Sequence, residues 1–351
     1  MPAPEGTTIT IRRPDDMHLH VRDGAVVLKD ILRHVTERFD RAIIMPNLKP
    51  PVTKIGDADA YRGRIEAALT GSARRDFTPL MTLYLTDNTS PEDVRRVKEC
   101  DFVYAFKYYP AGATTNSDSG VTDVRKVYPT IEAMQEHKVP LLLHGEVTDA
   151  DVDIFDREAV FIERILTPLA RDFPELPMVL EHVTSKNGVD FVRSAGAHMH
   201  GTITAHHLYL TRNELLVGGI RPHHFCLPVV KTIEDRDALR EAAASDDPSF
   251  FAGTDSAPHA IHNKETACGA AGVYTSHAAI ELYAEALDDA DALERLEDFA
   301  SMRGANFYGL PPATRTQTLV KRAREIPDRY NFGHDQLVPF RAGSSVAWSL
   351  A

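Results

Sequence analysis

Short apolar runs alternate with amphipathic segments along the whole of this 351-residue chain, and this pattern most limits its fold. Apolar runs of strand length separated by helical patterns indicate parallel strands joined by crossover helices. We expect eight strands, near residues 16–20, 42–45, 77–83, 102–107, 141–144, 178–181, 200–204 and 250–253. Helices are expected between them, among others at 26–39, 58–69, 124–137 and 159–172, and from Pro91 after a capping Ser90.

Eight such units predict a closed (β/α)8 TIM barrel. Polar side chains follow most of the predicted strands, and the carboxyl ends of the strands are the face on which barrel active sites are built. An open doubly wound sheet would gather its site at one switch point, and the chain has no Gly-x-Gly-x-x-Gly or P-loop sequence to support one. We expect a single domain over residues 1–351, with the barrel core at about 14–310.

Two segments fall outside the predicted barrel. Residues 7–12 alternate in polarity and predict a short N-terminal flanking strand. The C-terminal extension, residues 311–351, carries strand patterns at 316–319 and 345–349. We expect both segments to pack on the outside of the barrel.

Charge and composition exclude several kinds of partner. The 39 basic and 51 acidic residues give a formal net charge of −12, which argues against nucleic acid or an anionic membrane surface. No secretory leader or membrane-spanning run is recognisable, so we expect a cytoplasmic protein. The three cysteines, Cys100, Cys226 and Cys268, are widely spaced and are interpreted as reduced thiols, of which Cys226 is expected to line a site.

Histidine and aspartate residues at the predicted strand ends form a set of metal ligands. His18 and His20 are two apart on one strand, so their side chains point to the same side. His144 and His182 follow two further strands, and Asp255 follows the last one. Imidazole nitrogen and carboxylate oxygen both bind zinc well, and these five residues could hold two ions.

Lys107 ends an apolar run, where an unpaired ammonium would be unfavourable. An ammonium has no lone pair for a metal. Lys107 therefore either forms a salt bridge, with Asp101 or Glu146 as candidate partners, or is chemically converted into an anionic ligand. Capture of carbon dioxide by the neutral amine would give a carbamate able to bridge two cations, and burial beside cations lowers a lysine pKa enough to allow it.

Further histidines are less decisive. The doublets at 206–207 and 223–224 are expected to be exposed or hydrogen-bonded within loops, and their roles stay open. His259 lies on the loop after the last strand, beside Asp255.

Several motifs together resemble those of dihydroorotases, a family of the amidohydrolase superfamily, and in particular its monofunctional bacterial type. The His-x-His pair marks only the superfamily, whereas the Arg22-Asp23 that follows, Met45-Pro-Asn47 and the Thr114-Thr115 loop are more specific. The resemblance covers nearly the whole chain. Its motifs lie at residues 12–24, 45–52, 106–116, 143–146, 181–184, 203–208, 251–259 and 337–340.

The resemblance implies a binuclear centre of two zinc or other divalent ions. His18, His20, Asp255 and an N6-carboxylated Lys107 would hold one ion, and Lys107, His144 and His182 the other. It also implies substrate contacts from several loops. These are Arg22, Asn47 and His259 for a carboxylate, backbone groups near Leu227 and Ala271 for a pyrimidine ring, and Thr114 and Thr115 at the tip of a mobile loop.

The activity that the resemblance implies is the reversible hydrolysis of L-dihydroorotate to N-carbamoyl-L-aspartate in de novo pyrimidine (UMP) synthesis, in a homodimer. A hydroxide between the ions would attack the ring amide, and Asp255 would act as general acid and base. The guanidinium of Arg22 can hold the substrate carboxylate with two parallel hydrogen bonds, which a lysine could not reproduce. The alternatives are another cyclic amidohydrolase, of hydantoinase or allantoinase type, and a catalytically silent barrel that serves as a scaffold.

Overall fold

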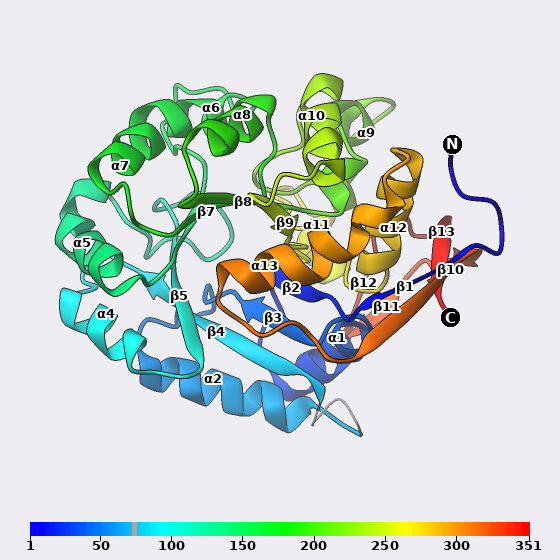
Figure 1. Ribbon diagram of the computed structural model, residues 1–351, viewed down its shortest axis with the longest axis horizontal. Coiled ribbons are helices and arrows are strands. Elements are labelled where there is room, and N and C mark those ends of the chain that lie inside the picture. Colours follow the sequence, from blue (N-terminus) through cyan, green and yellow to red (C-terminus); the bar gives the residue numbers. More distant parts are fainter. Residues whose placement is uncertain (72–75) are drawn as a thin grey trace.

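The computed structural model describes residues 1–71 and 76–351 and contains an eight-stranded parallel barrel (Figure 1). The strands follow one another around the barrel in chain order, so each pairs with the next along the sequence. The predicted (β/α)8 barrel is confirmed. Its strands are β2 (Asp15–Leu19), β3 (Arg41–Ile44), β4 (Thr78–Leu85), β5 (Val103–Tyr108), β6 (Leu141–His144), β7 (Met178–Glu181), β8 (Met199–Ile203) and β9 (Phe250–Ala252).

The barrel closes between β2 and the segment that follows β9. The amide of Asp255 donates to the carbonyl of His18 at 2.8 Å, and the amide of His20 donates to the carbonyl of Ser256 at 3.3 Å. Leu19 and Ser256 form a parallel bridge at the same place. Barrel closure therefore brings the His-x-His pair beside Asp255, although more than 230 residues separate them in the sequence.

Helices surround the barrel, and those predicted from amphipathic patterns are present (Figure 1). Ser90 caps α4 by accepting a hydrogen bond from the amide of Asp93, whose carboxylate accepts from the amide of Ser90 in return. No helix of the described residues is long and apolar enough to span a bilayer. The helices are α1 (Ala25–Arg38), α2 (Ile55–Ala68), α4 (Pro91–Lys98), α5 (Tyr128–His137), α6 (Arg157–Phe161), α7 (Thr167–Asp172), α8 (Lys186–Ser194), α9 (Arg212–Leu216), α10 (Ile233–Ala244), α11 (Ile261–Lys264), α12 (Ala279–Asp289) and α13 (Arg303–Phe307).

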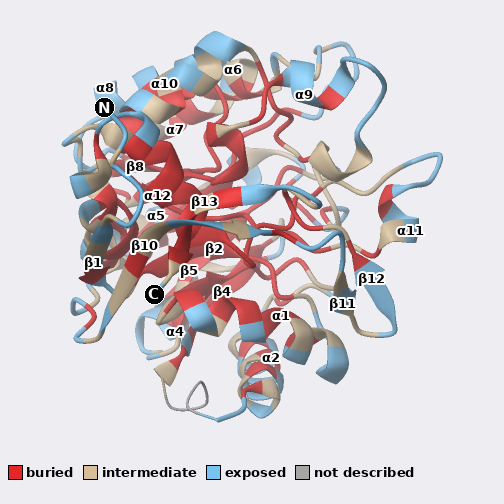
Figure 2. Ribbon diagram, turned by 90° about the vertical axis from the view of Figure 1, so that its right-hand side faces the viewer, coloured by how far each residue is buried: buried red, intermediate tan, exposed pale blue. Residues whose placement is uncertain are grey.

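The core has two layers, one between the strands and the helices and one inside the barrel. The barrel strands are mostly buried, whereas much of the surrounding helices is exposed (Figure 2). Ala105, Leu142 and Val179 belong to the inner layer. Side chains two residues apart on a strand share a face, so Lys107 and His144 point into the same interior, one step closer to the carboxyl ends. The apolar layer inside the barrel therefore lies directly beneath these polar residues, on the side of the strands' amino ends.

The two chain ends meet in a small sheet beside the barrel (Figure 1). Strand β1 (Thr8–Arg12) pairs antiparallel with β10 (Thr316–Glu325), which also pairs with β13 (Ser345–Leu350). Trp348 of β13 is buried, and its indole N–H donates to Asp288 at the end of α12. The flanking strand and the extension are confirmed, while the single-domain organisation stays a prediction.

The structure also contains a hairpin that we did not predict, formed by β11 (Tyr330–Phe332) and β12 (Asp335–Leu337). Each strand has three residues, of which only Leu337 is buried, so neither produces a recognisable apolar run.

Candidate active site

A pocket at the carboxyl ends of the barrel strands gathers most of the predicted site residues. Lys107 lies at the end of β5 with its side chain fully buried, and His259 contacts Arg22, so both adjoin this pocket. Tyr109, Ala257 and Gly272 also line it and were not predicted. The predicted residues that line it are His18, His20, Arg22, Asn47, Thr114, Thr115, His144, His182, Leu227, Asp255 and Ala271.

The predicted metal ligands form one contiguous group. The Nε2 atoms of His18 and His20 lie 3.4 and 3.0 Å from Oδ1 of Asp255. The ring of His182 lies 5.1 Å from that of His18 and 4.8 Å from that of His144, measured between centroids. All five side chains are buried, so their unused nitrogen and oxygen atoms face one another rather than water.

Two glutamates orient the histidines. Oε2 of Glu181 accepts a hydrogen bond from Nδ1 of His18 at 2.8 Å, which leaves Nε2 free to face Asp255. Glu181 is held in turn by the hydroxyl of Thr202 at 2.6 Å. Glu146 lies 2.9 Å from Nε2 of His144, leaving Nδ1 on the opposite side of that ring. Such carboxylate partners fix the tautomer of metal-binding histidines.

Lys107 is the one buried cation of this group. Its side chain is 0% exposed, and among the described residues Nζ has no hydrogen-bond partner. Burial lowers the pKa of Lys107 to about 8, against the opposing effect of Glu181 and Asp255. The alternative of a salt bridge to Asp101 or Glu146 is wrong within the described chain, since neither pair lies within 4 Å. A buried lysine amine without a hydrogen-bond partner indicates that another group, bound or covalently attached, satisfies it.

The four histidines and Asp255 are placed and chemically suited to bind divalent metal ions. Nδ1 of His182 is buried and has no partner among residues 1–71 and 76–351, as is true of Nζ of Lys107. Burial lowers the pKa values of His18, His20 and His182, which favours the neutral imidazole, the form that binds metals. Four imidazoles and a carboxylate converge here, which is a combination that zinc prefers.

Three site residues within three positions of a strand's carboxyl end adopt left-handed backbone conformations. Arg22, His182 and Asp255 have φ values of 61°, 42° and 44°. Non-glycine residues rarely adopt this conformation, which is concentrated at functional sites. Asp16 helps to hold the backbone next to Asp255, because the Asp16 carboxylate accepts hydrogen bonds from the amide and hydroxyl of Thr254, at 2.8 and 2.6 Å.

Gly253 allows the close approach that this arrangement requires. A Cβ atom on Gly253 would lie 2.8 Å from Cγ2 of Thr202 and 3.1 Å from Cβ of His18. The absence of a side chain therefore lets the end of β9 pack against β8 and β2, which places Asp255 next to His18.

Arg22 and His259 form a cationic corner of the pocket. Nε of Arg22 donates to the carbonyl of Pro258 at 3.0 Å, and one terminal nitrogen lies 2.9 Å from Nε2 of His259. The same Nε2 lies 2.9 Å from the carbonyl of Ala271. Burial lowers the pKa of His259 to about 2, so its ring is neutral. One Nε2 atom cannot both accept from Arg22 and donate to Ala271, and one of these contacts is left unsatisfied.

The loop at residues 110–121 covers the pocket. The side-chain amide of Asn47 donates to the carbonyl of Thr115 at 3.1 Å, and Asn116 donates to the carbonyl of Asn47 at 2.9 Å. The hydroxyl of Thr115 donates to the carbonyl of Ala271 at 3.5 Å. Asn47 therefore anchors the loop over the pocket.

The less decisive histidines are divided between two environments. His206 and His207 are fully buried next to Cys226, outside the pocket. His223 pairs with Glu265, and Nδ1 of His224 donates to the carbonyl of Glu214. All three cysteines are free, as predicted. The expectation that Cys226 lines the site is wrong, since the pocket is lined by its neighbour Leu227 and not by Cys226.

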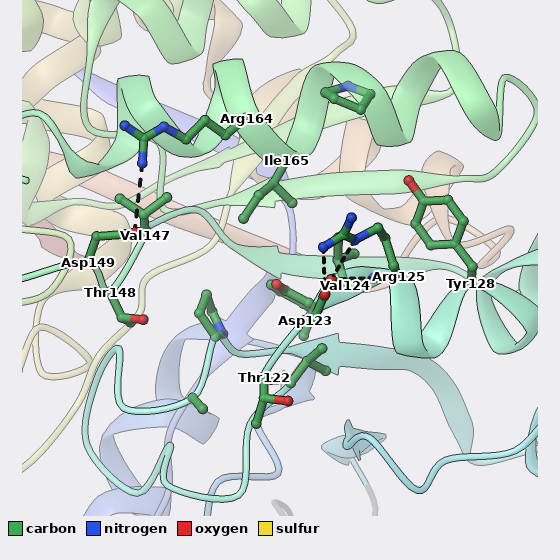
Figure 3. A pocket seen from close by; sticks show the side chains of 15 residues that line it. Thr122, Asp123, Val124, Arg125, Tyr128, Val147, Thr148, Asp149, Arg164 and Ile165 are labelled. Carbon is green, nitrogen blue, oxygen red and sulfur yellow. Dashed lines mark hydrogen bonds and ion pairs between the residues drawn. The ribbon is translucent and has the colours of Figure 1, made fainter.

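A larger cavity of about 540 Å³ lies outside the barrel mouth, beside the base of the same loop (Figure 3). Its charged side chains are paired with one another, Arg125 with Asp123 at 2.9 Å and Arg164 with Asp149 at 3.8 Å. It contains none of the predicted site residues, so we place the chemistry in the smaller pocket.

Comparison with known proteins agrees with this geometry. The model of the amidohydrolase family matches residues 13–313. The dihydroorotase of Nitrosococcus oceani is 57% identical over 345 residues, which cover 98% of this chain and 99% of that protein. This chain belongs to the dihydroorotases of the amidohydrolase family. It is therefore a hydrolase of cyclic amide bonds, in a family that is typically metal-dependent.

Solved structures of dihydroorotases share the whole fold. That from Campylobacter jejuni is 35% identical, with a TM-score of 0.90, and the match covers 99% of this chain and 98% of that one. The enzyme from Saccharomyces cerevisiae, in complex with 5-fluoroorotic acid, is 34% identical, with a TM-score of 0.88 and 98% of both chains covered. The resemblance inferred from the motifs is confirmed.

Proposed function

We propose that this hydrolase interconverts L-dihydroorotate and N-carbamoyl-L-aspartate in pyrimidine synthesis, with two zinc ions joined by a carboxylated Lys107. The observation that carries the proposal is the buried Nζ of Lys107, which has no partner among the described residues and stands next to the histidine and aspartate group. In the carboxylation, the neutral amine attacks carbon dioxide, an N–C bond forms, and a proton is released. The pKa of about 8 makes the neutral amine accessible.

The carbamate would supply the two oxygens that bridge the ions. His18, His20 and Asp255 would complete one ion's ligands, and His144 and His182 those of the other. The bound ions would supply Lewis-acid chemistry, lowering the pKa of water and polarising the ring carbonyl. The hydrogen bonds that Glu181 accepts from His18 and that Glu146 accepts from His144 support this assignment, because each leaves the other ring nitrogen available.

Asp255 is the residue that moves the proton. In hydrolysis it takes a proton from the attacking water and delivers it to the departing ring nitrogen, and in ring closure the transfers reverse. Burial raises the pKa of Asp255, which favours accepting a proton. Its contacts with His18 and His20, at 3.4 and 3.0 Å, hold the carboxylate in one orientation.

Arg22, His259 and Asn47 hold the substrate carboxylate. A carboxylate can accept hydrogen bonds from Arg22 and from Nε2 of His259 together, which removes the conflict between those two groups. The backbone at Leu227 and Ala271 lines the other side and would contact the ring. Thr114 and Thr115 close the pocket from above and exclude water.

The activity assay uses purified, metal-loaded protein and three cyclic amides. We expect interconversion of dihydroorotate and carbamoyl aspartate, and no turnover of hydantoin or allantoin, since neither carries a carboxylate for Arg22. Activity on hydantoin or allantoin without activity on dihydroorotate would reject the proposal in favour of the other cyclic amidohydrolases. Bound metal without activity on any of the three would favour the scaffold alternative.

Arg22→Lys tests the carboxylate contact. We expect KM for dihydroorotate to rise by about 10- to 100-fold with a smaller change in kcat, because a charge-assisted pair of hydrogen bonds contributes about 1.5–3 kcal/mol. Steady-state kinetics measures this. Arg64→Lys is the control, since Arg64 pairs with Asp23 at 2.9 Å and does not line the pocket. An unchanged KM in Arg22→Lys would remove Arg22 from the binding site.

We further propose that the protein is a cytoplasmic homodimer and that its ligand is a small molecule. Within each subunit, residues 1–351 would form one domain. Packing of β1 and β13 side chains into the same core as the barrel helices supports the single domain. Light scattering of the purified protein tests the dimer, and a monomeric mass at micromolar concentration would contradict it.

A further inference from the structure

A second group of potential ligands lies after β8, apart from the active-site pocket. His206 and His207 belong to the short helix His206–Leu208, and Cys226 lies 19 residues further along. Their side chains are 0%, 2% and 1% exposed. One ligand atom from each lies within 4.8 Å of those of the other two. Two imidazoles and a thiol thus converge at a place sealed from solvent.

His206 has no structural explanation within the described chain. Neither Nδ1 nor Nε2 of this buried ring has a hydrogen-bond partner among residues 1–71 and 76–351. A buried polar group without a partner destabilises a folded protein. The ring packs against His207, with centroids 4.4 Å apart, so its unpartnered atoms belong to the same cluster.

His207 is oriented as a ligand would be. The hydroxyl of Thr204 lies 2.7 Å from its Nδ1 and the carbonyl of Pro228 lies 3.2 Å from its Nε2, so either nitrogen can carry the proton in the metal-free ring. With the proton on Nδ1, donated to Thr204, the lone pair on Nε2 is available to a metal ion. That Nε2 lies 3.6 Å from Sγ of Cys226. The carbonyl oxygen of Pro228 lies 3.2 Å from Nε2 and 3.3 Å from Sγ, so an oxygen donor is also present.

We propose that His206, His207 and Cys226 bind one thiophilic metal ion, of the Zn²⁺ or Cu⁺ class, at a site distinct from the active centre. Two neutral imidazoles and a thiolate suit such soft or borderline ions, whereas Mg²⁺ and Ca²⁺ require oxygen ligands. Burial raises the pKa of the Cys226 thiol to about 12, so the free thiol is protonated. Binding forms a metal–sulfur bond and releases that proton.

The site would tie two loops together at the wall of the substrate pocket. Cys226 directly precedes Leu227, which lines the pocket, while Phe225 and Val229 line a separate cavity of about 440 Å³ on another side. Strand β8 supplies none of the ligands assigned to the active centre. An ion held here would fix the segment that carries Leu227 without taking part in the reaction.

Co²⁺ is the probe, because a cobalt–thiolate bond gives a near-ultraviolet charge-transfer band, and no ligand of the proposed active centre is a cysteine. We expect reduced wild-type protein at saturating Co²⁺ to show this band and Cys226→Ser to lack it, with one fewer ion per chain. His206→Gln should raise the Kd for the band by more than about 10-fold. Added Zn²⁺ should displace the band.

Two controls isolate the cluster. Cys268→Ser removes an exposed thiol, and His277→Gln removes another buried imidazole whose nitrogens have no partner in the described structure. Both should keep the band and the ion count of the wild type. No thiolate band at saturating Co²⁺, or a band and ion count unchanged in Cys226→Ser and His206→Gln, would overturn the proposal. These readouts do not depend on dihydroorotate turnover.

Discussion

Lys107→Ala is expected to lose at least one of the two active-centre ions and to lose turnover by about 10³-fold or more. The physical reason is that the carboxylated Lys107 would offer an anion to both ions. Without the bridging carbamate, two cations would repel each other in a buried site. Metal analysis and dihydroorotate kinetics on the purified variant measure both losses.

Chemical rescue and a matched lysine sharpen this result. A small carboxylic acid such as acetate or propionate can occupy the vacated space and should restore part of both metal and activity in Lys107→Ala. Lys231→Ala is the control, because Lys231 is also buried but donates to Thr184 and to the carbonyl of Val229. It should keep its ions. Two ions and full activity in Lys107→Ala would exclude the bridging role.

Asp255→Asn is expected to lower kcat by about 10²- to 10⁴-fold, the usual contribution of a general acid and base. The amide keeps an oxygen that can face His18 and His20 but cannot carry the proton. KM should change little, because Arg22, His259 and Asn47 still hold the carboxylate. Steady-state kinetics in both reaction directions measures the loss, which should be of similar size in each.

Metal content decides whether Asp255 acts through proton transfer or only as a ligand. The kinetic comparison is therefore made with Asp255→Asn and wild type at equal ion content per chain. A normal kcat at equal content would show that another group moves the proton. A loss that disappears when more metal is added would assign Asp255 a ligand role alone.

The barrel could be predicted because its signals are local. Each strand is a short apolar run, and Lys107 and His144 are identifiable as inward-facing from their position at the ends of such runs. The contiguity of His18 with Asp255 also followed, since a closed barrel must bring the first strand beside the last. The residue types then limited the chemistry to metal binding.

The contacts that could not be predicted are those between side chains of different strands and loops, because they depend on how these elements are placed relative to one another. Glu181 ends an apolar run as Lys107 does, and this was a usable signal, but its pairing with His18 follows only from the placement of β7 relative to β2. Glu146 was considered as a partner of Lys107, whereas the turn after β6 directs it to His144. The meeting of His206 with Cys226 depends on loops without any periodic pattern.

Counting divalent ions per chain while dihydroorotate turnover is recorded tests the central proposal most directly. The Cys226→Ser variant is used, so that only active-centre ions are counted, and Zn²⁺ is added stepwise to metal-free protein in the presence of bicarbonate. We expect two ions per chain at saturation, with full turnover reached only as the second ion binds. Full turnover with one ion or none, or two bound ions without turnover, would contradict a binuclear dihydroorotase centre.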